Sequence, residues 1–583
     1  MPDTKCKMLK QKIILICVLL AGETVSHSFG QEQIISRDKM TGTGERIFIH
    51  TDREEYIAGE NFWFSAYTYD RQDNNKPGIS GTGYIELLNS DNNPVIQKRV
   101  RLTGGAGHGT FQLPDTLSPG TYILKAYTNL ILNLPPDNCF RKVISIYNSL
   151  TSRNFRKIVY AAEPVQEKET ADPVISVRSS ELFSRREKIT LEIEIDKDIV
   201  ASPENANLSI SVSSTSGNDN LENPDDYLHP YTGPAEINDV RFSPEVTRHF
   251  LYGRLIPQKA GAVIGNQVML LSVPGKEALF QYSLTDGEGN FCFMIGNDAA
   301  PDEIVIQQKD NGSGNLIRIG SPFPDNYPEY GKITDTLLSG LPGHIAEWSV
   351  NHQVSKIYGM SSAGKPPADS SFRQKRARFY GIPDMELRMA DYILLPNMQE
   401  VFFELIPGVS MRTGRARSGI TVTSLADNRA YDYDATLMID GVVIADPAVI
   451  AGMNPELVER VDILRSEYAV GGYHFYGIVN VITKSGNYGS FPLPDNAVRF
   501  PYRIFDPDIP FVSPDYSETE AKQSRVPDFR NTLYWNPSVK PGKDGKATIE
   551  FWSSDYVSDY VISIQGISSE GIPLSAMKTI RVE

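Results

Sequence analysis

The stretch IHTDREEYIAGENFWFSAYTYD, from Ile49 to Asp70, joins a charged turn to a run in which large apolar residues alternate with small or polar ones. Alternation with a period of two is typical of a β-strand with one buried face. Similar short runs, separated by Gly, Pro, Asn and Asp, fill the chain from Arg46 to Ile146: RIFI, NFWFSAYTY, GYIELL, PVIQKRVRL, GTFQL, GTYILKAY and KVISI. Seven short strands in about 100 residues predict an antiparallel β-sandwich.

The charged turn resembles the start of a macroglobulin-like domain. In that family Thr-Asp-Arg or Thr-Asp-Lys is followed by Tyr, and then by Gly-Glu or Gly-Gln before a long strand. The residues that match this pattern, in order, are Thr51, Asp52, Arg53, Tyr56, Gly59 and Glu60. The resemblance implies a macroglobulin-like sandwich over residues 31–150. Gly suits a tight bend, and Thr and Asp can bond local backbone groups, so we expect a solvated turn with no catalytic role.

Length and composition extend this β-rich pattern to the whole chain. At roughly 150 residues per domain, 583 residues predict about four domains. Hydrophobic residues make up 40% and charged residues 22%, which is ordinary for a folded protein. The 45 Gly and 38 Pro are scattered throughout, as expected where turns join many short strands. The predicted fold class is mainly β, with several antiparallel sandwiches in tandem and one α+β domain.

Residues 1–30 are predicted to be a signal peptide. An apolar run at 13–21 is followed by the small residues Ser28 and Gly30, which would leave Gln31 as the first mature residue. Nine apolar residues are too few to cross a hydrocarbon core about 30 Å thick, and a bulky Ile before Cys17 disfavours a lipoprotein signal. We therefore expect an exported protein of the periplasm, the outer membrane or the cell surface. The basic segment before the run consists of Lys5, Lys7, Lys10 and Lys12.

Charge and cysteine content exclude some partners. Removing residues 1–30 takes away four Lys and two acids, so the net charge goes from −15 to −17. A chain this acidic is repelled by nucleic acid and by anionic lipid surfaces, so we expect no nucleic-acid partner. Cys139 and Cys292 remain after cleavage and lie in different predicted domains. We expect two buried thiols rather than a disulfide.

A second sandwich is predicted to be split in the sequence. After a polar linker at 151–171, the stretch LFSRREKITLEIEI at 182–195 repeats the opening pattern, and the strand NLSISVSS follows it. Near the end of the chain, GKATIEFWSSDYVSDYVISIQ at 545–565 aligns without a gap with GHGTFQLPDTLSPGTYILKAY at 107–127. The matched positions are Phe183, Glu187 and Ile189 with Tyr56, Glu60 and Phe62, and Thr548, Ile549, Phe551 and Tyr560 with Thr110, Phe111, Leu113 and Tyr122.

Neither piece offers enough strands to bury a core alone. Residues 172–215 and 525–583 together offer the seven strands that such a sandwich needs, with an insertion of roughly 310 residues between them. The alternative is an independent hairpin domain at the end of the chain.

The first predicted module of the insertion, at 240–320, resembles the carboxypeptidase-regulatory-like module, a small β-sandwich. The landmarks that match are Gly253, Val268, Asp286, Gly289 and Phe291. The acidic stretch from Asp286 to Asn290 could suggest a calcium loop. An EF-hand needs Gly at its sixth position and Glu at its twelfth, where this chain has Phe291 and Asn297. A hairpin turn is therefore the favoured interpretation.

A helix is predicted from Thr334 to Tyr358. Its histidines, His344 and His352, are eight residues apart, too far to share a metal without a third partner, so we expect ordinary surface or core histidines. The residues expected on its apolar face are Leu337, Leu338, Leu341, Ile345 and Trp348.

Residues 380–490 resemble the plug domain of TonB-dependent outer-membrane receptors. The resemblance implies an α+β scaffold, in which Asp440 and Gly441 turn a hairpin and Leu457, Val458 and Val461 line a short helix that enters a strand. A receptor barrel would need about 22 further strands, whereas 99 residues follow Lys484, so we expect a plug fold without its own transporter barrel. The matching segments are LIPGVSM at 405–411, TLMIDGVVI at 436–444, PELVERVDILR at 455–465 and GIVNVITKSG at 477–486.

No motif for catalysis is visible in the sequence. HExxH and GxSxG are absent, and neither cysteine has the context of a macroglobulin thioester. The stretch GMSSAGKPP from Gly359 fits part of a phosphate loop, but Pro366 and Pro367 stand where a Ser or Thr and a helix are needed. We therefore predict no catalytic, cofactor-binding or metal residues, no cofactor and no nucleotide.

Two classes of function remain open. The first is a non-enzymatic binding or assembly protein of the Gram-negative cell envelope, with an outer-membrane protein or a surface glycan as partner and no transmembrane segment of its own. The second is an enzyme, such as a hydrolase acting on surface polymers; an accessory role in TonB-dependent uptake is a further alternative. A cleft holding two carboxyls of raised pKa would favour an enzyme, whereas an exposed apolar patch or a free sheet edge would favour binding.

The signal-peptide assignment predicts cleavage after Gly30. Amino-terminal sequencing of the mature protein from the cell envelope should begin at Gln31. A retained Met1 or an acylated Cys17 would contradict it.

Overall fold

A computed structural model describes residues 44–583 except 71–75, 149, 151–153, 161–173, 216–241, 298–302, 310–314, 326, 328–331, 341, 360–362, 365–376, 415–416, 471–472, 490, 494 and 508. The predicted signal peptide and most of the phosphate-loop-like stretch therefore lie outside the described residues. The chain forms two compact units. The platform unit comprises 34–247, 323–369 and 505–583, and the insert unit comprises 248–322 and 370–504.

The first sandwich of the platform unit contains all seven strands that the sequence predicts. One sheet has β1 and β7 on either side of β3, and the other has the order β2-β9-β8-β5-β6. Aromatic residues fill the space between them; Phe62 meets Phe111 edge to face at 5.5 Å. The elements are β1 (Glu45–Thr51), β2 (Glu55–Ile57), β3 (Asn61–Asp70), β4 (Lys76–Pro77), β5 (Thr82–Leu88), β6 (Pro94–Arg101), β7 (Ala106–Gln112), β8 (Gly120–Tyr127), η1 (Ile131–Asn133), η2 (Pro136–Asn138) and β9 (Phe140–Tyr147).

The predicted linker and the predicted helix each contain a strand. The predicted linker at 151–171 contains strand β10 (Asn154–Tyr160), and the first part of the predicted helix is strand β21 (Lys332–Ser339). These strands pair antiparallel, and β10 joins the first sandwich beside β8. The helix α4 (Gly343–Ile357) starts only after Gly340, whose φ is 91°, and Pro342. Both residues interrupt helical structure, so Leu337 lies exposed on a strand instead of on a helix face.

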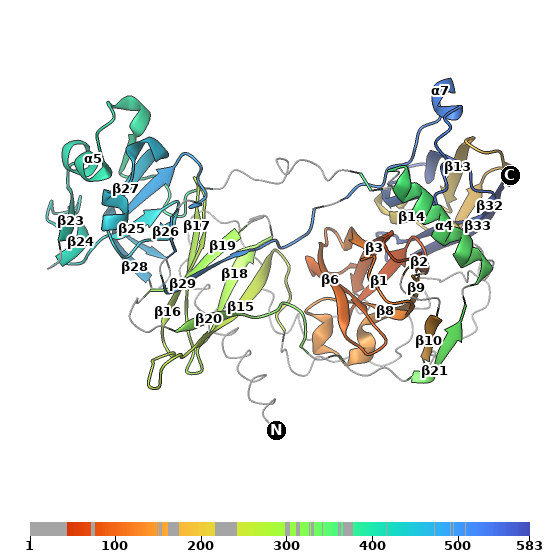
Figure 1. Cartoon of the computed structure of the whole chain (residues 1–583), viewed down its shortest axis with the longest axis horizontal. Helices are drawn as coiled ribbons and strands as arrows, with labels where there is room; N and C mark the ends of the chain where they lie inside the picture. The colour runs from red at the N-terminus through yellow and green to blue at the C-terminus, as the bar shows by residue number, and fades with distance from the viewer. Residues whose placement is uncertain are drawn as a thin grey trace. The chain divides into compact units, whose positions relative to one another are not determined.

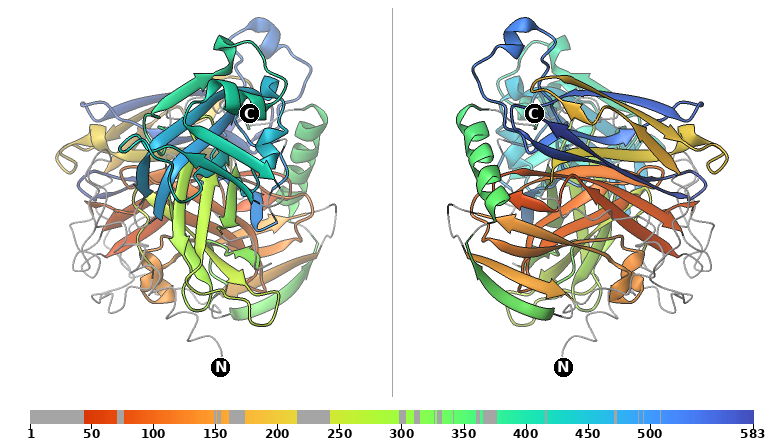
Figure 2. Two further views of the ribbon diagram at one scale, coloured as in Figure 1. Left: turned by 90° about the vertical axis from the view of Figure 1, so that its left-hand side faces the viewer. Right: turned by 90° about the vertical axis from the view of Figure 1, so that its right-hand side faces the viewer.

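Helix α4 packs against both sandwiches of the platform unit, and Figure 2 shows it along one side of the layered sheets. Lys356 Nζ lies 2.7 Å from Asp115 Oδ1 in the first sandwich, and Tyr556 of the second sandwich donates a hydrogen bond to Glu347 at 2.9 Å. The apolar contact beneath the helix consists of Ile57, Tyr147, Phe155, Ile345 and Trp348.

The second sandwich draws its strands from two distant parts of the chain. Strand β13 pairs antiparallel with β31, and β14 lies between β32 and β30, so both segments share one core, as the sequence repeat predicts. Figure 1 shows β13 and β14 beside β32 and β33. The elements are β11 (Ile175–Arg178), β12 (Leu182–Phe183), β13 (Lys188–Ile195), η3 (Pro203–Asn205), β14 (Asn207–Ser214), α7 (Thr519–Lys522), β30 (Thr532–Val539), β31 (Lys546–Trp552), β32 (Ser558–Ile567) and β33 (Pro573–Val582).

The register corrects the gapless alignment of the two sandwiches. Phe62 pairs with Phe111 in the first sandwich, and its counterpart Ile189 pairs with Phe551 in the second, so Phe551 and not Ile549 takes the place of Phe111. The loop after β31 is two residues shorter than the loop after β7. A shift of two residues keeps every side chain on its face of the sheet, which is why the hydrophobic pattern alone did not reveal it.

The aligned tyrosines occupy equivalent positions. Tyr122 donates its hydroxyl hydrogen to the carbonyl of Ser118 at 2.7 Å, and Tyr560 donates to the carbonyl of Tyr556 at 3.0 Å. Each bond reaches four residues back and fixes the bend before the strand, as a tyrosine corner does in sandwich folds.

The insert unit begins with a small sandwich. Its sheets have the orders β18-β15-β20 and β17-β16-β19-β29, so its last strand comes from far downstream in the chain. The turn at Asp286 is not a hairpin, because β17 and β18 belong to different sheets; the Asp286 carboxylate accepts the backbone N–H groups of Glu288 and Asn290. The strands are β15 (Arg248–Ile256), β16 (Val268–Val273), β17 (Leu279–Leu284), β18 (Asn290–Gly296), β19 (Glu303–Gln308), β20 (Leu316–Ile319) and β29 (Ala497–Pro501).

The rest of the insert unit is an α+β fold around the sheet β22-β27-β28-β25-β26. Asp440 and Gly441 turn the predicted hairpin with φ of 49° and 83°. The predicted short helix is a single 3-10 turn that ends at Leu457, so Val458 and Val461 lie buried on a strand. The elements are β22 (Met385–Arg388), η4 (Met389–Asp391), α5 (Met398–Leu405), β23 (Val409–Gly414), β24 (Arg417–Val422), β25 (Thr436–Ile439), β26 (Val442–Val443), α6 (Ala448–Ala451), η5 (Pro455–Leu457), β27 (Val458–Val470) and β28 (Tyr473–Thr483).

Truncation of Trp348 tests the packing of α4. Trp348→Ala removes the largest side chain beneath the helix, so we expect the free energy of unfolding of the platform unit to fall by about 3–5 kcal/mol. Tryptophan fluorescence during denaturant unfolding measures it, because the other three tryptophans (Trp63, Trp535 and Trp552) also belong to this unit. Val350→Ala on the solvent side of α4 is the matched control, and an equal loss there would contradict the packing role.

Candidate binding site

The charged turn that opens the first sandwich is buried, which corrects the expectation of a solvated turn. Asp52 is only 2% exposed, and Arg53 and Tyr56 are buried beside it. One carboxylate oxygen of Asp52 accepts the Tyr56 hydroxyl at 2.7 Å and the Trp63 backbone N–H at 2.9 Å. The other accepts the hydroxyl of Thr532, from the second sandwich, at 2.9 Å. The turn is buried because the second sandwich covers it.

An ion pair within the first sandwich extends this network, and a hydrogen bond carries it across the seam between the two sandwiches. Arg53 donates to Glu60 Oε2 at 3.1 Å, and Glu60 Oε1 accepts the side-chain amide of Asn531 at 2.9 Å. Asn531 in turn accepts from Asn351 of α4 at 3.3 Å. Burial raises the pKa of Asp52, and the Arg53 guanidinium opposes that rise. These carboxylates are therefore bound to donors of their own protein and serve as a structural joint.

A serine-lined face of β14 forms the rest of the seam. His50 Nδ1 lies 2.6 Å from the hydroxyl of Ser209, and its Nε2 lies 3.2 Å from the hydroxyl of Ser563. Tyr67 also donates to Ser209, at 2.7 Å. Burial holds the pKa of His50 well below its usual range, and the positive charge of Lys142 adds to this. His50 is therefore neutral at neutral pH.

Other buried carboxyls with a raised pKa are also used by the fold. Burial is the main cause of the rise in each case. None of them lines either of the two cavities described below. Their hydrogen-bond donors include Ser80 and Thr128 for Glu45, Thr483 and Tyr488 for Asp440, and Tyr380 and Arg460 for Asp462.

The predicted metal and thiol assignments can be placed on the structure. His344 Nε2 lies 3.3 Å from Glu55 Oε2, on the side of α4 that faces the first sandwich. In the described part of the chain, no three or more His, Cys, Asp and Glu side chains gather in a way that could hold a metal. Cys139 and Cys292 are both free and buried, as predicted. The described residues also include no helix with the length and apolar character needed to cross a membrane.

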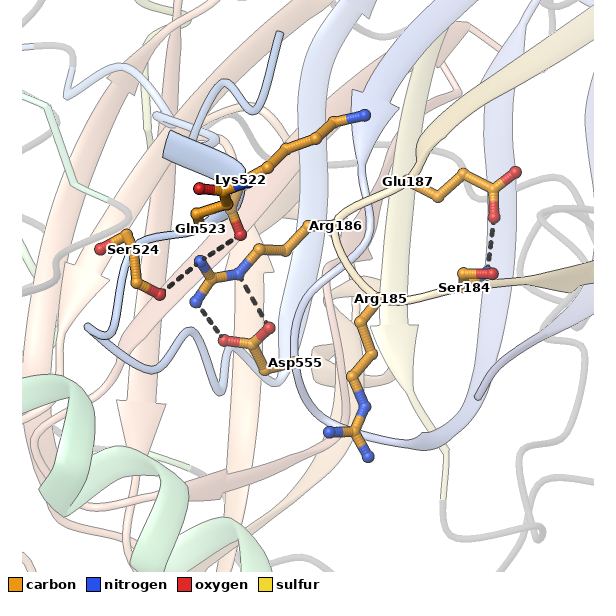
Figure 3. A pocket seen from close by; sticks show the side chains of 8 residues that line it. All are labelled: Ser184, Arg185, Arg186, Glu187, Lys522, Gln523, Ser524 and Asp555. Atoms are coloured by element: carbon orange, nitrogen blue, oxygen red, sulfur yellow. Dashed lines mark hydrogen bonds and ion pairs between the residues drawn. The ribbon is translucent and has the colours of Figure 1, made fainter. Parts of the chain in front are cut away.

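The larger cavity, about 550 Å³ and widely open, lies at the turn before β13 (Figure 3). Arg186 forms its wall in a left-handed conformation with φ of 53°. The Arg186 guanidinium makes two bonds to the Asp555 carboxylate, at 2.8 and 2.6 Å, and further bonds to backbone carbonyls of residues 521–526. The other lining residues are Ser184, Arg185, Glu187, Lys522, Gln523 and Ser524.

A second cavity of about 270 Å³ lies at the seam and is rich in aromatic side chains. Trp63 and Phe511 meet there edge to face at 5.5 Å. Neither cavity was predicted from the sequence. One feature of the sequence could have pointed to the larger cavity. The repeated turn has two arginines, Arg185 and Arg186, where the first copy of the turn has Ala58 and Gly59.

No protein-family model matches the sequence, and no curated protein matches it either. Among solved structures, the chain is similar to a Salmonella α-2-macroglobulin reacted with methylamine, with 8% identity and a TM-score of 0.24 over 93% of this chain and 40% of that one. The native E. coli α-2-macroglobulin has 8% identity and a TM-score of 0.24, over 92% and 40%. The E. coli adhesin FdeC has 11% identity and a TM-score of 0.14, over 51% and 64%.

The chain thus spans 40% of the length of the α-2-macroglobulin structures that it matches. TM-scores this low establish neither a common overall fold nor a common function. The architecture of this protein therefore stands on its own sheets and cores.

The pH dependence of stability tests the seam. The unfolded chain protonates His50 below pH about 6.5, whereas the folded chain keeps it neutral, so stability should be lost as pH falls through that value. His50→Gln should remove this loss, which amounts to at most about 1.4 kcal/mol per pH unit. Tryptophan-monitored unfolding at pH 7.5 and 5.5 measures the difference. His474→Gln, at an exposed site, is the control, and an unchanged pH dependence in the His50 variant would contradict the assignment.

Proposed function

We propose that this protein is a non-enzymatic binding or assembly protein of the Gram-negative cell envelope. In this proposal it is exported, and it engages an outer-membrane protein or a surface glycan through macroglobulin-like and plug-like domains. The macroglobulin-like pattern at 51–60 and the plug-like segments between 405 and 486 support it. We propose in addition that residues 240–320 form a carboxypeptidase-regulatory-like module.

Exposed apolar side chains on the insert unit carry the proposal. Ile393 is 90% exposed between its exposed neighbours Tyr392 and Leu394, and Phe403 on α5 is 84% exposed. Burying such a side chain is worth roughly 1.5–3 kcal/mol, so leaving several of them in water is costly unless a partner covers them. Exposed apolar surface of this kind is typical of protein interaction sites.

The hydrogen bonds that the buried carboxyls make inside the fold also favour a binding function over hydrolysis. Glu45, Asp52, Asp440 and Asp462 have a raised pKa, the property that catalytic acids often have. Each of them, however, accepts hydrogen bonds from its own protein inside the fold. A general acid or base must instead reach the substrate at hydrogen-bond distance.

Site-specific photocrosslinking in intact cells tests the proposal. A photoreactive amino acid at position 393 should attach to one envelope protein, whereas the same group at Val263, which is also exposed on the insert unit, should not. Leu394→Asp, at the exposed position next to the crosslinking group, should weaken the crosslink without lowering the melting temperature, because the side chain is already more than half in water.

Two results would contradict the proposal. The first is equal attachment at both positions, or at neither. The second is turnover of a peptide, ester or glycoside substrate by the purified protein that disappears when one particular acid pair is replaced.

A further inference from the structure

The turn after β2 and the turn after β12 are built alike. In the first, Glu60 Oε2 accepts the backbone N–H of Ile57 at 2.9 Å, and in the second, Glu187 Oε2 accepts that of Ser184 at 2.5 Å. β2 pairs in parallel with β9, and β12 pairs in parallel with β33, the strands that follow β8 and β32. The two turns therefore occupy equivalent places in the two sandwiches.

The aspartates beside the two turns are equivalent as well. The backbone N–H of Leu113 bonds to the carbonyl of Glu60 at 3.0 Å, and that of Ser553 bonds to the carbonyl of Glu187 at 2.9 Å. Asp115 and Asp555 each follow two residues later. In each sandwich a carboxylate thus lies next to the turn.

In the first sandwich this turn binds a helix. His344 of α4 lies 3.3 Å from Glu55, and Lys356 of α4 lies 2.7 Å from Asp115. Gly59 permits this close approach, since a Cβ at that position would lie 2.2 Å from Asp115 Oδ1. The turn supplies the acidic groups and the helix supplies the basic ones.

In the second sandwich the same turn lacks such a helix among the described residues. Arg186 stands in the place of Gly59, and its guanidinium bonds to Asp555, as Lys356 bonds to Asp115. A positive φ is strained for a non-glycine residue, and the bonds of Arg186 to residues 521–526 offset this strain. The one-turn helix α7 covers part of the turn, and the cavity of about 550 Å³ remains beside it (Figure 3).

The charges around the cavity are the reverse of those on the first turn. Arg185 projects from the turn, and Figure 3 shows no hydrogen bond or ion pair between it and the other lining residues. The Lys522 ammonium lies 5.2 Å from the Trp552 ring. Two acids also line the cavity: the Glu187 carboxylate accepts the Ser184 N–H, and Asp555 is paired with Arg186. Leu182, 57% exposed, stands in the place of Glu55, two residues before Ser184 of the lining, and offers an apolar side chain next to the cavity.

We propose that this cavity binds an acidic, helical segment of a partner protein, in the way that the first turn binds α4. The complementary ligand carries carboxylates opposite Arg185 and Lys522 and an apolar side chain opposite Leu182. This inference rests on the proposed function, because it takes the protein to be a binding protein, and it names a second contact surface, on the platform unit.

A peptide taken from the chain itself tests the inference. The probe is a fluorescent peptide of residues 343–357 with the changes His344→Glu and Lys356→Glu, and its binding to the full-length protein is measured by anisotropy. We expect saturable binding that weakens with salt, and binding of the unchanged peptide that is weaker by about tenfold or more. Arg185→Glu combined with Lys522→Glu should weaken the binding of the changed peptide by a similar factor.

The matched control is Lys197→Glu combined with Lys543→Glu. These exposed lysines lie on the same sandwich away from the cavity, so this variant has the same charge change and should bind as the wild type does. Equal weakening in both double variants, or no binding of the changed peptide, would overturn the inference. Binding of polygalacturonate through Arg185 and Lys522 without binding of the peptide would also overturn it, in favour of an anionic glycan. The crosslinking experiment at position 393 does not involve this cavity. A failure of the proposed function can therefore be distinguished from a failure of this inference.

Discussion

The structure of the platform unit depends on a buried ion pair of the first sandwich whose two carboxylates accept hydrogen bonds across the seam from the second sandwich. Asp52 and Glu60 of the first sandwich accept hydrogen bonds from Thr532 and Asn531 of the second, and Arg53 lies between the two acids. Removing one partner from such a buried pair costs about 3–5 kcal/mol, because a charge is left uncompensated in a dry place. The seam therefore fixes the two sandwiches against each other, and α4, which bonds to Asn531, closes over the joint.

One turn, used twice, shows how a repeated fold acquires different surfaces. Where the first sandwich has Gly59, the backbone approaches a carboxylate and a helix closely. Where the second has Arg186, the side chain fills the equivalent position and ties down residues 521–526 instead. In the second turn the Arg186 guanidinium thus supplies internally the cation that α4 supplies from outside in the first.

Much of the fold could be predicted from the sequence, and the errors have physical reasons. Period-two alternation located the seven strands of the first sandwich, and the repeat joined strands about 350 residues apart into one core. The same alternation is unchanged by a shift of two residues, so the gapless alignment placed β31 two residues out of its true register. Leu337 and Leu338 fit a helical face, yet Gly340 and Pro342 ended that pattern and left them on a strand. The cavity at Arg186 was missed, because nothing local distinguishes an arginine that binds carbonyls from one in water.

The sequence by itself determined the local conformations: alternating apolar residues made strands, Asp440-Gly441 made a hairpin, and the tyrosines at 122 and 560 made corners. Only the tertiary structure decided which polar faces are buried. The serines of β14 and the charged turn at Asp52 have the composition of solvent-exposed surface, yet a second sheet covers both. A polar residue is compatible with water or with a well-placed hydrogen-bond partner, and the partner here comes from a segment hundreds of residues away, which no local pattern encodes.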